Sequence, residues 1–265
     1  MARSNGQRIV NDVDDWFWGI SEKNAAANFI DPNKNLRSNV DHYRRTLEAS
    51  DLVTVSTLFL KEQIEAWGVP VRLIPNRVSA HMFSRRRHRE GKPVVGWVGS
   101  TAHRSGDLDI LREPFAKIDG AVSFHHTGDH PFHASFSDEV GLAADSVSVT
   151  PMLSPFEYPG GFTFDIGVVP LVDIPFNSAK SGIKGLEYAA AGIPFVASPL
   201  PEYIRLRDEY GIGRIASSAS EWVEHIEELF DPAVRAAEAD RQHELVLEHF
   251  HVKDMAKDFD DVVWA

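Results

Sequence analysis

Short apolar runs rich in valine and isoleucine alternate along this chain with longer segments whose apolar residues recur at helical spacing. Such alternation is typical of parallel βαβ units, in which a helix crosses over between two strands of one sheet. The sequence therefore predicts an α/β fold. Strands are expected at residues 8–13, 52–56, 71–75, 93–99, 122–126, 147–150, 165–170 and 194–197, and helices at residues 36–49, 57–67, 108–118, 183–191, 221–230 and 232–249.

A basic run separates two series of these elements. The run RRRHR at residues 85–89 precedes Gly91 and Pro93. A charged stretch flanked by glycine and proline is typical of a solvated linker. We therefore predict two α/β units that are joined near residues 80–92.

Composition narrows the class of protein. The chain has 265 residues and a net charge of −12, which does not give the basic footprint of a nucleic-acid-binding protein. It contains no cysteine, so disulfides and thiolate metal sites are excluded. No apolar run reaches the roughly 18 residues that a transmembrane helix needs, and the polar residues 1–8 lack the apolar stretch of a signal peptide. The expected compartment is the cytoplasm.

The first candidate loop follows the strand expected at residues 93–99. It reads GSTAHRSG over residues 99–106 and precedes an expected helix. In open parallel sheets, ligands bind outside the carboxyl ends of the strands. Glycine lets a backbone approach a phosphate, a helix N-terminus offers N–H groups, and Arg104 would add a bidentate contact. The alternative is a purely structural turn, because a Gly-Ser turn before a helix is a weak signal.

The second candidate loop, residues 175–187, carries two lysines four residues apart. At that spacing, Lys180 and Lys184 are expected to share one face near the start of a helix. Cations at a helix N-terminus oppose the helix dipole, so the pair favours a bound anion such as a diphosphate. Glu187 lies one turn deeper, where its carboxylate would accept hydrogen bonds from both hydroxyls of a ribose. The open alternative is a surface ion pair between Lys184 and Glu187, which contributes little.

A third feature is the polar loop at residues 127–130, which contains Gly128. Four histidines cluster in and around it, namely His125, His126, His130 and His133. No convincing set of carboxylates or thiols completes a zinc site there. We therefore expect incidental histidines in a polar loop and predict no metal site.

Several stretches resemble family-4-like glycosyltransferases of the GT-B fold. Residues 49–57 (ASDLVTVST) and 69–78 (VPVRLIPNRV) resemble the end of the first domain of these enzymes. Residues 95–100 (VGWVGS) resemble the opening strand of their donor domain. Residues 165–171 and 180–194 (KSGIKGLEYAAAGIP) resemble their nucleotide-sugar motif, and this last block is the specific one. The resemblance implies an α/β, GT-B-like fold of two Rossmann-like domains, with the N-terminal one incomplete.

The resemblance also implies a reaction. Such an enzyme transfers a sugar from a UDP- or GDP-sugar to an acceptor, here an unknown glycan, lipid or protein, with retention of configuration and without a metal ion or other cofactor. Glu187 matches the ribose-binding glutamate of the family. The implied donor-binding residues are Gly99, Ser100, Thr101, His103, Arg104, Gly128, Asn177, Lys180, Ser181, Lys184 and Glu187.

The implied catalytic residues are Asp14, Asp15 and Lys180. The two aspartates follow an expected strand, at the point where relatives place a residue that faces the donor sugar. Aspartates that cap a helix are the equally open alternative. The family often has another glutamate eight residues before the ribose ligand, and this chain has Ala179 there. Either Lys180 or Asn177 takes over the role of that glutamate, or the transferred sugar differs.

The resemblance divides the chain into three parts. Residues 1–90 are expected to form a shortened, acceptor-side Rossmann-like domain with the linker. Residues 91–248 are expected to form the donor-binding domain, and residues 249–265 a C-terminal helix that returns to the first domain.

Four aromatic residues near the N-terminus concern possible contacts with another protein chain. Trp16, Phe17, Trp18 and Phe29 favour an apolar face that packs against a second copy of the chain or a separate acceptor-domain protein. The alternative is that the cluster closes on the helix expected at residues 36–49. The alternative function is a catalytically degenerate nucleotide-sugar-binding subunit that needs a partner chain. A GT-B epimerase would need an acid/base set that the sequence does not show.

Overall fold

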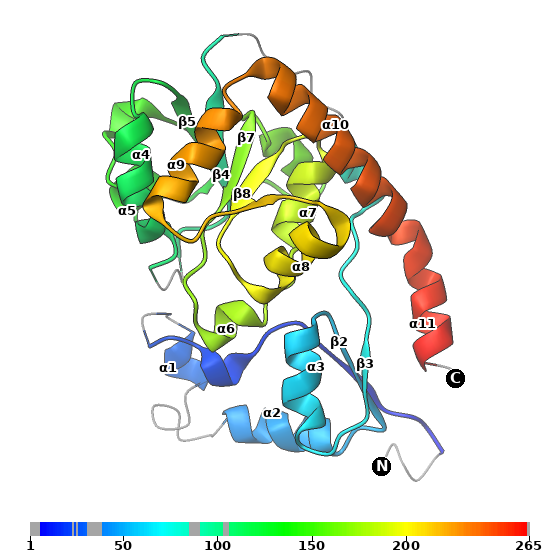
Figure 1. Ribbon diagram of the computed structural model, residues 1–265. Coiled ribbons are helices and arrows are strands. Elements are labelled where there is room, and N and C mark those ends of the chain that lie inside the picture. The colour runs from blue at the N-terminus through cyan, green and yellow to red at the C-terminus, as the bar shows by residue number, and fades with distance from the viewer. Residues whose placement is uncertain are drawn as a thin grey trace. The chain divides into compact units, whose positions relative to one another are not determined.

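The computed structural model describes residues 6–22, 24, 26–30, 39–84, 91–102 and 106–263, so the linker predicted at residues 85–89 lies outside the described residues. The chain forms two compact units, whose strands and helices are drawn in Figure 1. The small unit comprises residues 1–77, 173–181 and 253–265. The large unit comprises residues 78–172 and 182–252. The chain therefore enters the small unit three times.

A three-stranded parallel sheet forms the centre of the small unit. Its strands are β1 (Val10–Val13), β2 (Leu52–Val55) and β3 (Val71–Leu73), in that order. The central strand β2 is buried along its whole length. Its Val53 pairs with Asn11 on one side and Val71 on the other. The helices of this unit are α1 (Ala27–Ile30), α2 (Asn39–Glu48), α3 (Leu58–Glu65), α6 (Pro175–Ser178) and α11 (Met255–Val263).

The aromatic residues near the N-terminus pack mainly within their own unit. Trp16 is only 8% exposed, and its ring lies 4.7 Å from that of Trp18 and 5.4 Å from that of Trp67. Trp18 in turn stacks on Tyr43 of α2 at 5.6 Å. These contacts agree with the alternative in which the cluster closes on the following helix. Phe29 on α1 remains 70% exposed.

Helix α11 completes the core of the small unit. Phe259 packs against Leu52 and Ile74, two buried side chains of the sheet and its flank. Arg77 forms an ion pair with Asp258 at 2.6 Å, and neither side chain is more than about a quarter exposed. The C-terminal segment thus covers apolar surface that the first 77 residues leave open.

A six-stranded parallel sheet forms the centre of the large unit. Its strands are β4 (Val94–Val98), β5 (Ser123–Asp129), β6 (Val147–Pro151), β7 (Ile166–Val169), β8 (Phe195–Ala197) and β9 (Arg214–Ile215). They lie in the order β6-β5-β4-β7-β8-β9. The chain therefore moves outward from β4 to one edge, returns to β7, and moves outward to the other edge. This is the strand order of dinucleotide-binding Rossmann folds, whose ligands bind where the order reverses.

Helices cover both faces of this sheet (Figure 1). On one face lie α4 (Arg112–Ile118), α5 (Phe136–Val140) and α9 (Ala219–Glu228). On the other lie α7 (Ile183–Ala190), α8 (Pro201–Tyr210) and α10 (Pro232–His249). A sheet buried on both faces explains the near-continuous apolar runs of the central strands.

Candidate functional site

Two glycines bring the ends of β4 and β5 into unusually close contact. Gly99 follows β4 and Gly128 lies near the end of β5, with φ angles of 147° and 115°. A Cβ atom on Gly128 would lie 2.6 Å from the carbonyl oxygen of Gly99. The Gly99 N–H donates to the carbonyl oxygen of Thr127 at 2.8 Å. Only glycine combines such φ angles with so close an approach of two backbones.

A hollow of about 200 Å³ opens beside these strand ends, and we call it the strand-end hollow. It is lined by Val98, Gly99, Ser100, Thr127, Gly128, Met152, Leu153 and Tyr158. Its position outside the carboxyl ends of β4 and β5 is where open parallel sheets bind ligands. The sequence analysis identified Gly99, Ser100 and Gly128 but missed Met152, Leu153 and Tyr158. The apolar pair that follows Pro151, soon after the strand expected at residues 147–150, was the signal available for Met152 and Leu153.

Lys184 brings a positive charge to the end of β4. It lies in the first turn of α7, and its Nζ donates a hydrogen bond to the carbonyl oxygen of Val98. The ammonium group also lies 4.8 Å from the centroid of the Trp97 ring. Because Val98 lines the strand-end hollow, the lysine charge is held at the wall of that hollow. A cation so placed opposes the dipole of α7.

Glu187 lies one turn further along α7 and is linked to the same hollow by a hydrogen bond with Tyr158. Burial raises the pKa of Glu187 to about 7, while the charge of Lys184 and a hydrogen bond from Tyr158 act to lower it. Tyr158 itself lines the hollow. The carboxyl group is therefore poised to change protonation near neutral pH when a hydrogen-bond donor or a charge arrives.

The two candidate lysines do not share a helical face, contrary to the prediction. Helix α6 ends at Ser178 and α7 begins at Ile183, so Lys180 lies between them. Residues 173–181 group with the small unit, whereas Lys184 belongs to the large unit. The physical reason is a tertiary contact of the residue before Lys180. Ala179 is fully buried in the small-unit core, and its carbonyl oxygen accepts a hydrogen bond from Thr57 Oγ1 at 3.0 Å.

Polar groups of the small unit gather where its strands end. Asn76 Nδ2 donates to Asp14 Oδ1 at 3.0 Å and to Ser181 Oγ at 2.9 Å. Burial raises the pKa of Asp15, the charge of Lys180 lowers it, and the charge of Asp14 raises it further. The structure therefore brings together the three predicted catalytic residues, Asp14, Asp15 and Lys180, with Asn76, which the sequence analysis did not single out. We call these residues, with Ser181, the small-unit polar cluster.

Of the four remaining candidate residues, two are buried and two lie outside the described residues. His103 and Arg104 lie outside the described residues. Thr101 and Asn177 are buried, at 7% and 3% exposure, so they offer little surface to a ligand as they stand.

The histidines near β5 are used structurally. His125 Nδ1 pairs with Ser148 Oγ at 2.8 Å, and its Nε2 pairs with Thr127 Oγ1 at 2.9 Å. The ring of His126 stacks on those of Trp97 and Phe136, which also stack on each other. Among the described residues, no group of three or more His, Asp or Glu side chains is arranged to hold a metal ion.

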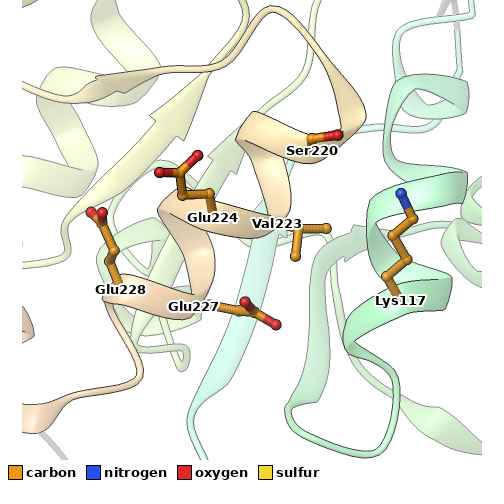
Figure 2. Close-up of a pocket in the computed structure, with 6 residues that line it drawn as sticks. All are labelled: Lys117, Ser220, Val223, Glu224, Glu227 and Glu228. Atoms are coloured by element: carbon orange, nitrogen blue, oxygen red, sulfur yellow. The ribbon is translucent and has the colours of Figure 1, made fainter.

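A second hollow, of about 420 Å³, lies between α4 and α9. Figure 2 shows Val223 and Glu227 of α9 directed toward α4, which carries Lys117, while Glu224 and Glu228 point to the other side of α9. Lys117 is paired with Glu113 on its own helix, and Glu228 is paired with Arg214. Because Lys117 and Glu228 already have partners, we interpret this hollow as a solvated groove between two helices.

Glycosyltransferases are among the solved structures that have a similar fold. HepE of Anabaena, solved with UDP and glucose, matches with a TM-score of 0.74 and 13% identity, over 100% of this chain and 73% of HepE. Sucrose-phosphate synthase of Thermosynechococcus elongatus matches with a TM-score of 0.68 and 19% identity, over 90% of this chain and 64% of that chain. The predicted α/β, GT-B-like fold is therefore confirmed.

The sequence comparison points to the same class. No family model matches the chain. It is 26% identical over 180 residues to TuaH of Bacillus subtilis (strain 168), provisionally named as a glycosyltransferase of teichuronic acid biosynthesis. The match covers 63% of this chain, and the chain spans only 45% of the length of TuaH. The chain is thus related in sequence to a glycosyltransferase and has the GT-B fold. No helix in the described ranges is long and apolar enough to cross a membrane.

Proposed function

We propose that this chain is a cytoplasmic glycosyltransferase that takes its sugar from a UDP- or GDP-sugar, retains the configuration of that sugar and uses no metal ion. The strand-end hollow carries the proposal. It combines close-packed glycines, the Lys184 ammonium group and the Tyr158–Glu187 pair in a sheet of Rossmann strand order. The similarity to TuaH and the UDP bound to HepE support this reaction class and this kind of donor.

Each group has a role in holding the donor. Lys184 now donates to a backbone carbonyl group, and a diphosphate is a stronger acceptor for the same ammonium group. Glycine backbones let phosphate oxygens approach closely. Glu187, once ionised, accepts hydrogen bonds from ribose hydroxyls. The side chain of Lys184 supplies positive charge that other glycosyltransferases take from a metal ion.

Transfer requires charge to build up on the leaving group. The acceptor oxygen forms the new bond to the anomeric carbon on the same face that the diphosphate leaves, which retains the configuration. The bond from that carbon to the diphosphate oxygen breaks with its electron pair left on the diphosphate. The acceptor proton passes to the departing diphosphate. Lys184 stabilises the developing negative charge. We also propose Asp14, Asp15 and Lys180 of the small-unit polar cluster as catalytic residues, as the resemblance implies.

Calorimetry with UDP and GDP tests donor binding. Glu187→Ala and Lys184→Ala should each weaken binding by about 10- to 100-fold, because each removes hydrogen bonds that involve a charged group. Lys117→Ala is the matched control, since Lys117 is a half-exposed lysine paired on α4, and it should bind as the unmodified chain does. Equal affinity in all four proteins would reject the assignment.

A turnover assay tests the chemistry and separates the alternative function. A transferase should hydrolyse its donor slowly in EDTA, and NMR of the released sugar should show the anomer of the donor. A catalytically degenerate nucleotide-sugar-binding subunit would bind the donor without hydrolysis. The specific observation that favours this alternative is Ala179, which stands at the position of the family's glutamate and is fully buried. Activity that EDTA abolishes and manganese restores would overturn the metal-free mechanism.

A further inference from the structure

One edge of the large-unit sheet is open. In the described part of the chain, β6 pairs with β5 on one side and has no strand on its other side. Ser148 and Pro151 of this strand are exposed, and Val149 at its centre is 56% exposed. An edge strand presents a row of N–H and C=O groups on which another strand can pair. The β6 edge therefore offers backbone hydrogen-bonding groups to a further strand.

The other sheet edges carry charges that oppose such pairing. The small-unit sheet ends in β1 and β3, which contain Asp12 and Arg72. The second edge of the large-unit sheet is β9, which has only two residues, one of them Arg214. Short length and charged side chains protect an edge strand from pairing with another chain. Of these four described edge strands, β6 alone contains no charged residue, so its edge lacks that protection.

The uncharged surface extends beyond β6 itself. Residues 146–156 contain no charged residue, although the chain as a whole is 25% charged. Exposed apolar side chains also gather here. Four of the eight large apolar side chains that are exposed among the described residues belong to β6 or to the loops that follow β5 and β6, namely Phe132, Val149, Met152 and Phe156. Apolar patches of this kind mark interaction sites.

The hydrogen bond of Met152 indicates which backbone groups of β6 face outward. The Met152 N–H group donates to the carbonyl oxygen of Asp129 on β5 at 3.2 Å. Every second residue of a strand bonds to the same neighbour, so Thr150 also faces β5, whereas the backbone groups of Val149 and Pro151 face outward. Pro151 agrees with this assignment, because a proline has no N–H group and is tolerated where that side of an edge strand is unpaired. Val149 is thus central among the outward-facing residues.

We propose that β6 pairs with the β6 strand of a second copy of this chain, antiparallel to it, about a two-fold axis at Val149. The two six-stranded sheets then form one continuous sheet. Val149 of each copy donates one backbone hydrogen bond to the other copy and accepts one from it. Val147 donates to the carbonyl oxygen of Pro151 in the other copy, which needs no N–H group from the proline. This contact goes beyond the proposed function and does not rest on it.

Charge and symmetry select a second copy as the occupant of this edge. Two copies that each have a net charge of −12 repel one another, so a contact between them needs a surface without ionised side chains. The strand pairing brings together only residues of the uncharged run at 146–156. Like charges directly opposite each other destabilise paired strands, whereas β-branched residues such as Val149 stabilise them. A two-fold contact also forms each of its interactions twice.

Sedimentation equilibrium tests the contact. Because the paired strands are short, we expect a dimer with a dissociation constant of roughly 1–100 µM. Val149→Lys places two ammonium groups opposite each other and should weaken the dimer by at least about tenfold. Val149→Thr stays β-branched and uncharged, and it should keep the dimer. Leu247→Lys is the matched control, because Leu247 is an exposed apolar residue on α10, and it should also keep the dimer. Circular dichroism melts show which variants fold.

Cysteine cross-linking locates the two-fold axis and decides even if Val149→Lys does not fold. The chain has no cysteine, so a single introduced cysteine forms a disulfide only between copies. Opposite residues of a hydrogen-bonded antiparallel pair have Cα atoms about 5.5 Å apart, within the roughly 4.4–6.8 Å that a disulfide spans. Val149→Cys should therefore cross-link when added diamide accepts two electrons and two protons from the two thiols. Met152→Cys, also exposed, is three residues from the axis, so its two copies lie roughly 20 Å apart and should not cross-link.

The outcomes separate this inference from the proposed function. A chain that remains a monomer well above about 100 µM, a dimer that Val149→Lys leaves intact, or equal cross-linking of the two cysteine variants would overturn the β6 contact. UDP binding is measured on the Val149 variants as well. Loss of the dimer with intact UDP binding supports a contact that is separate from the donor site. A dimer that binds no UDP overturns only the proposed donor.

Discussion

At the scale of single residues, opposing influences act on the pKa of the Glu187 carboxyl group. Burial raises its pKa to about 7, whereas Lys184 and Tyr158 lower it. Near pH 7 about half of the molecules therefore hold this group protonated until a ligand arrives. Hydrogen bonds from ribose hydroxyls favour the ionised form, so nucleotide affinity should increase as the pH rises through 7.

The same shift predicts a pH-dependent effect on stability. The folded-state pKa lies above the ordinary value of 4.5, so the folded chain binds this proton more tightly than the unfolded chain. The contribution of this group to the free energy of unfolding therefore falls as the pH rises from about 4.5 to about 7. Glu187→Gln should raise the free energy of unfolding by roughly 2 kcal/mol at pH 8, and by little at pH 5.

Urea unfolding at pH 5 and pH 8 measures this effect. Glu113→Gln is the control, because Glu113 is an exposed member of a surface pair on α4. It should change the free energy of unfolding by less than about 0.5 kcal/mol at either pH. A Glu187→Gln effect of the same size at both pH values would show that ionisation is not its cause.

At the scale of elements, the segment between α6 and α7 is anchored by α3. Thr57 caps α3 by accepting a hydrogen bond from the Leu60 N–H group, and its hydroxyl group donates to the carbonyl oxygen of Ala179. Both interactions are buried. One side chain thus starts a helix and positions Lys180 at the same time. A glutamate at position 179 would place a charge in an apolar core, which is consistent with alanine there.

Removing the hydroxyl group of Thr57 tests this anchor. Thr57→Val keeps the side-chain shape and should lower the free energy of unfolding by about 2 kcal/mol, because a cap is lost and two buried backbone groups lose their partner. Hydrogen exchange should accelerate at Asn177 and Lys180. Ser218→Ala, which removes the comparable cap of α9, should cost about 1 kcal/mol and leave those amides unchanged. Unaltered exchange at Asn177 and Lys180 in Thr57→Val would contradict the anchor.

At the scale of the whole molecule, each unit depends on segments that are distant in sequence. The small unit takes residues 173–181 and 253–265 in addition to residues 1–77. Its helix α11 contributes Phe259 to the apolar contact with Leu52 and Ile74. The stability of the first 77 residues is therefore linked to the last helix of the chain.

Phe259→Ala should destabilise the small unit selectively. The loss of a partly buried aromatic side chain should cost about 1–3 kcal/mol, and hydrogen-exchange protection should fall in β2 and β3. Protection in β4 and β7 of the large unit should stay constant. Leu247→Ala, at an exposed position on α10, is the control and should change neither unit. Equal loss of protection in both units would mean that α11 stabilises the chain as a whole.

The spacing of apolar residues predicted the strands and helices well where that spacing was regular over a few residues. The apolar runs at residues 52–56 and 165–170 became β2 and β7, and the helical spacing at 232–249 became α10 with the same limits. The sequence analysis missed the short helices α1, α5 and α6, and also α8 and β9. Helix α8 carries several charged residues and few apolar ones, and β9 has only two residues, so neither gives a clear period.

The sequence by itself determined the α/β class, the glycines at the ends of β4 and β5, and the nearness of Lys184 to Glu187 on one helix, because these follow from spacing along a few residues. Only the tertiary structure decided which residues distant in sequence contact one another. Thr57 and Ala179 are 122 residues apart, and their contact takes Lys180 away from the helix of Lys184. Tyr158, the hydrogen-bond partner of Glu187, lies in a loop whose sequence shows neither helical nor strand periodicity. Contacts of this kind depend on how sheets and loops pack, and no local spacing encodes them.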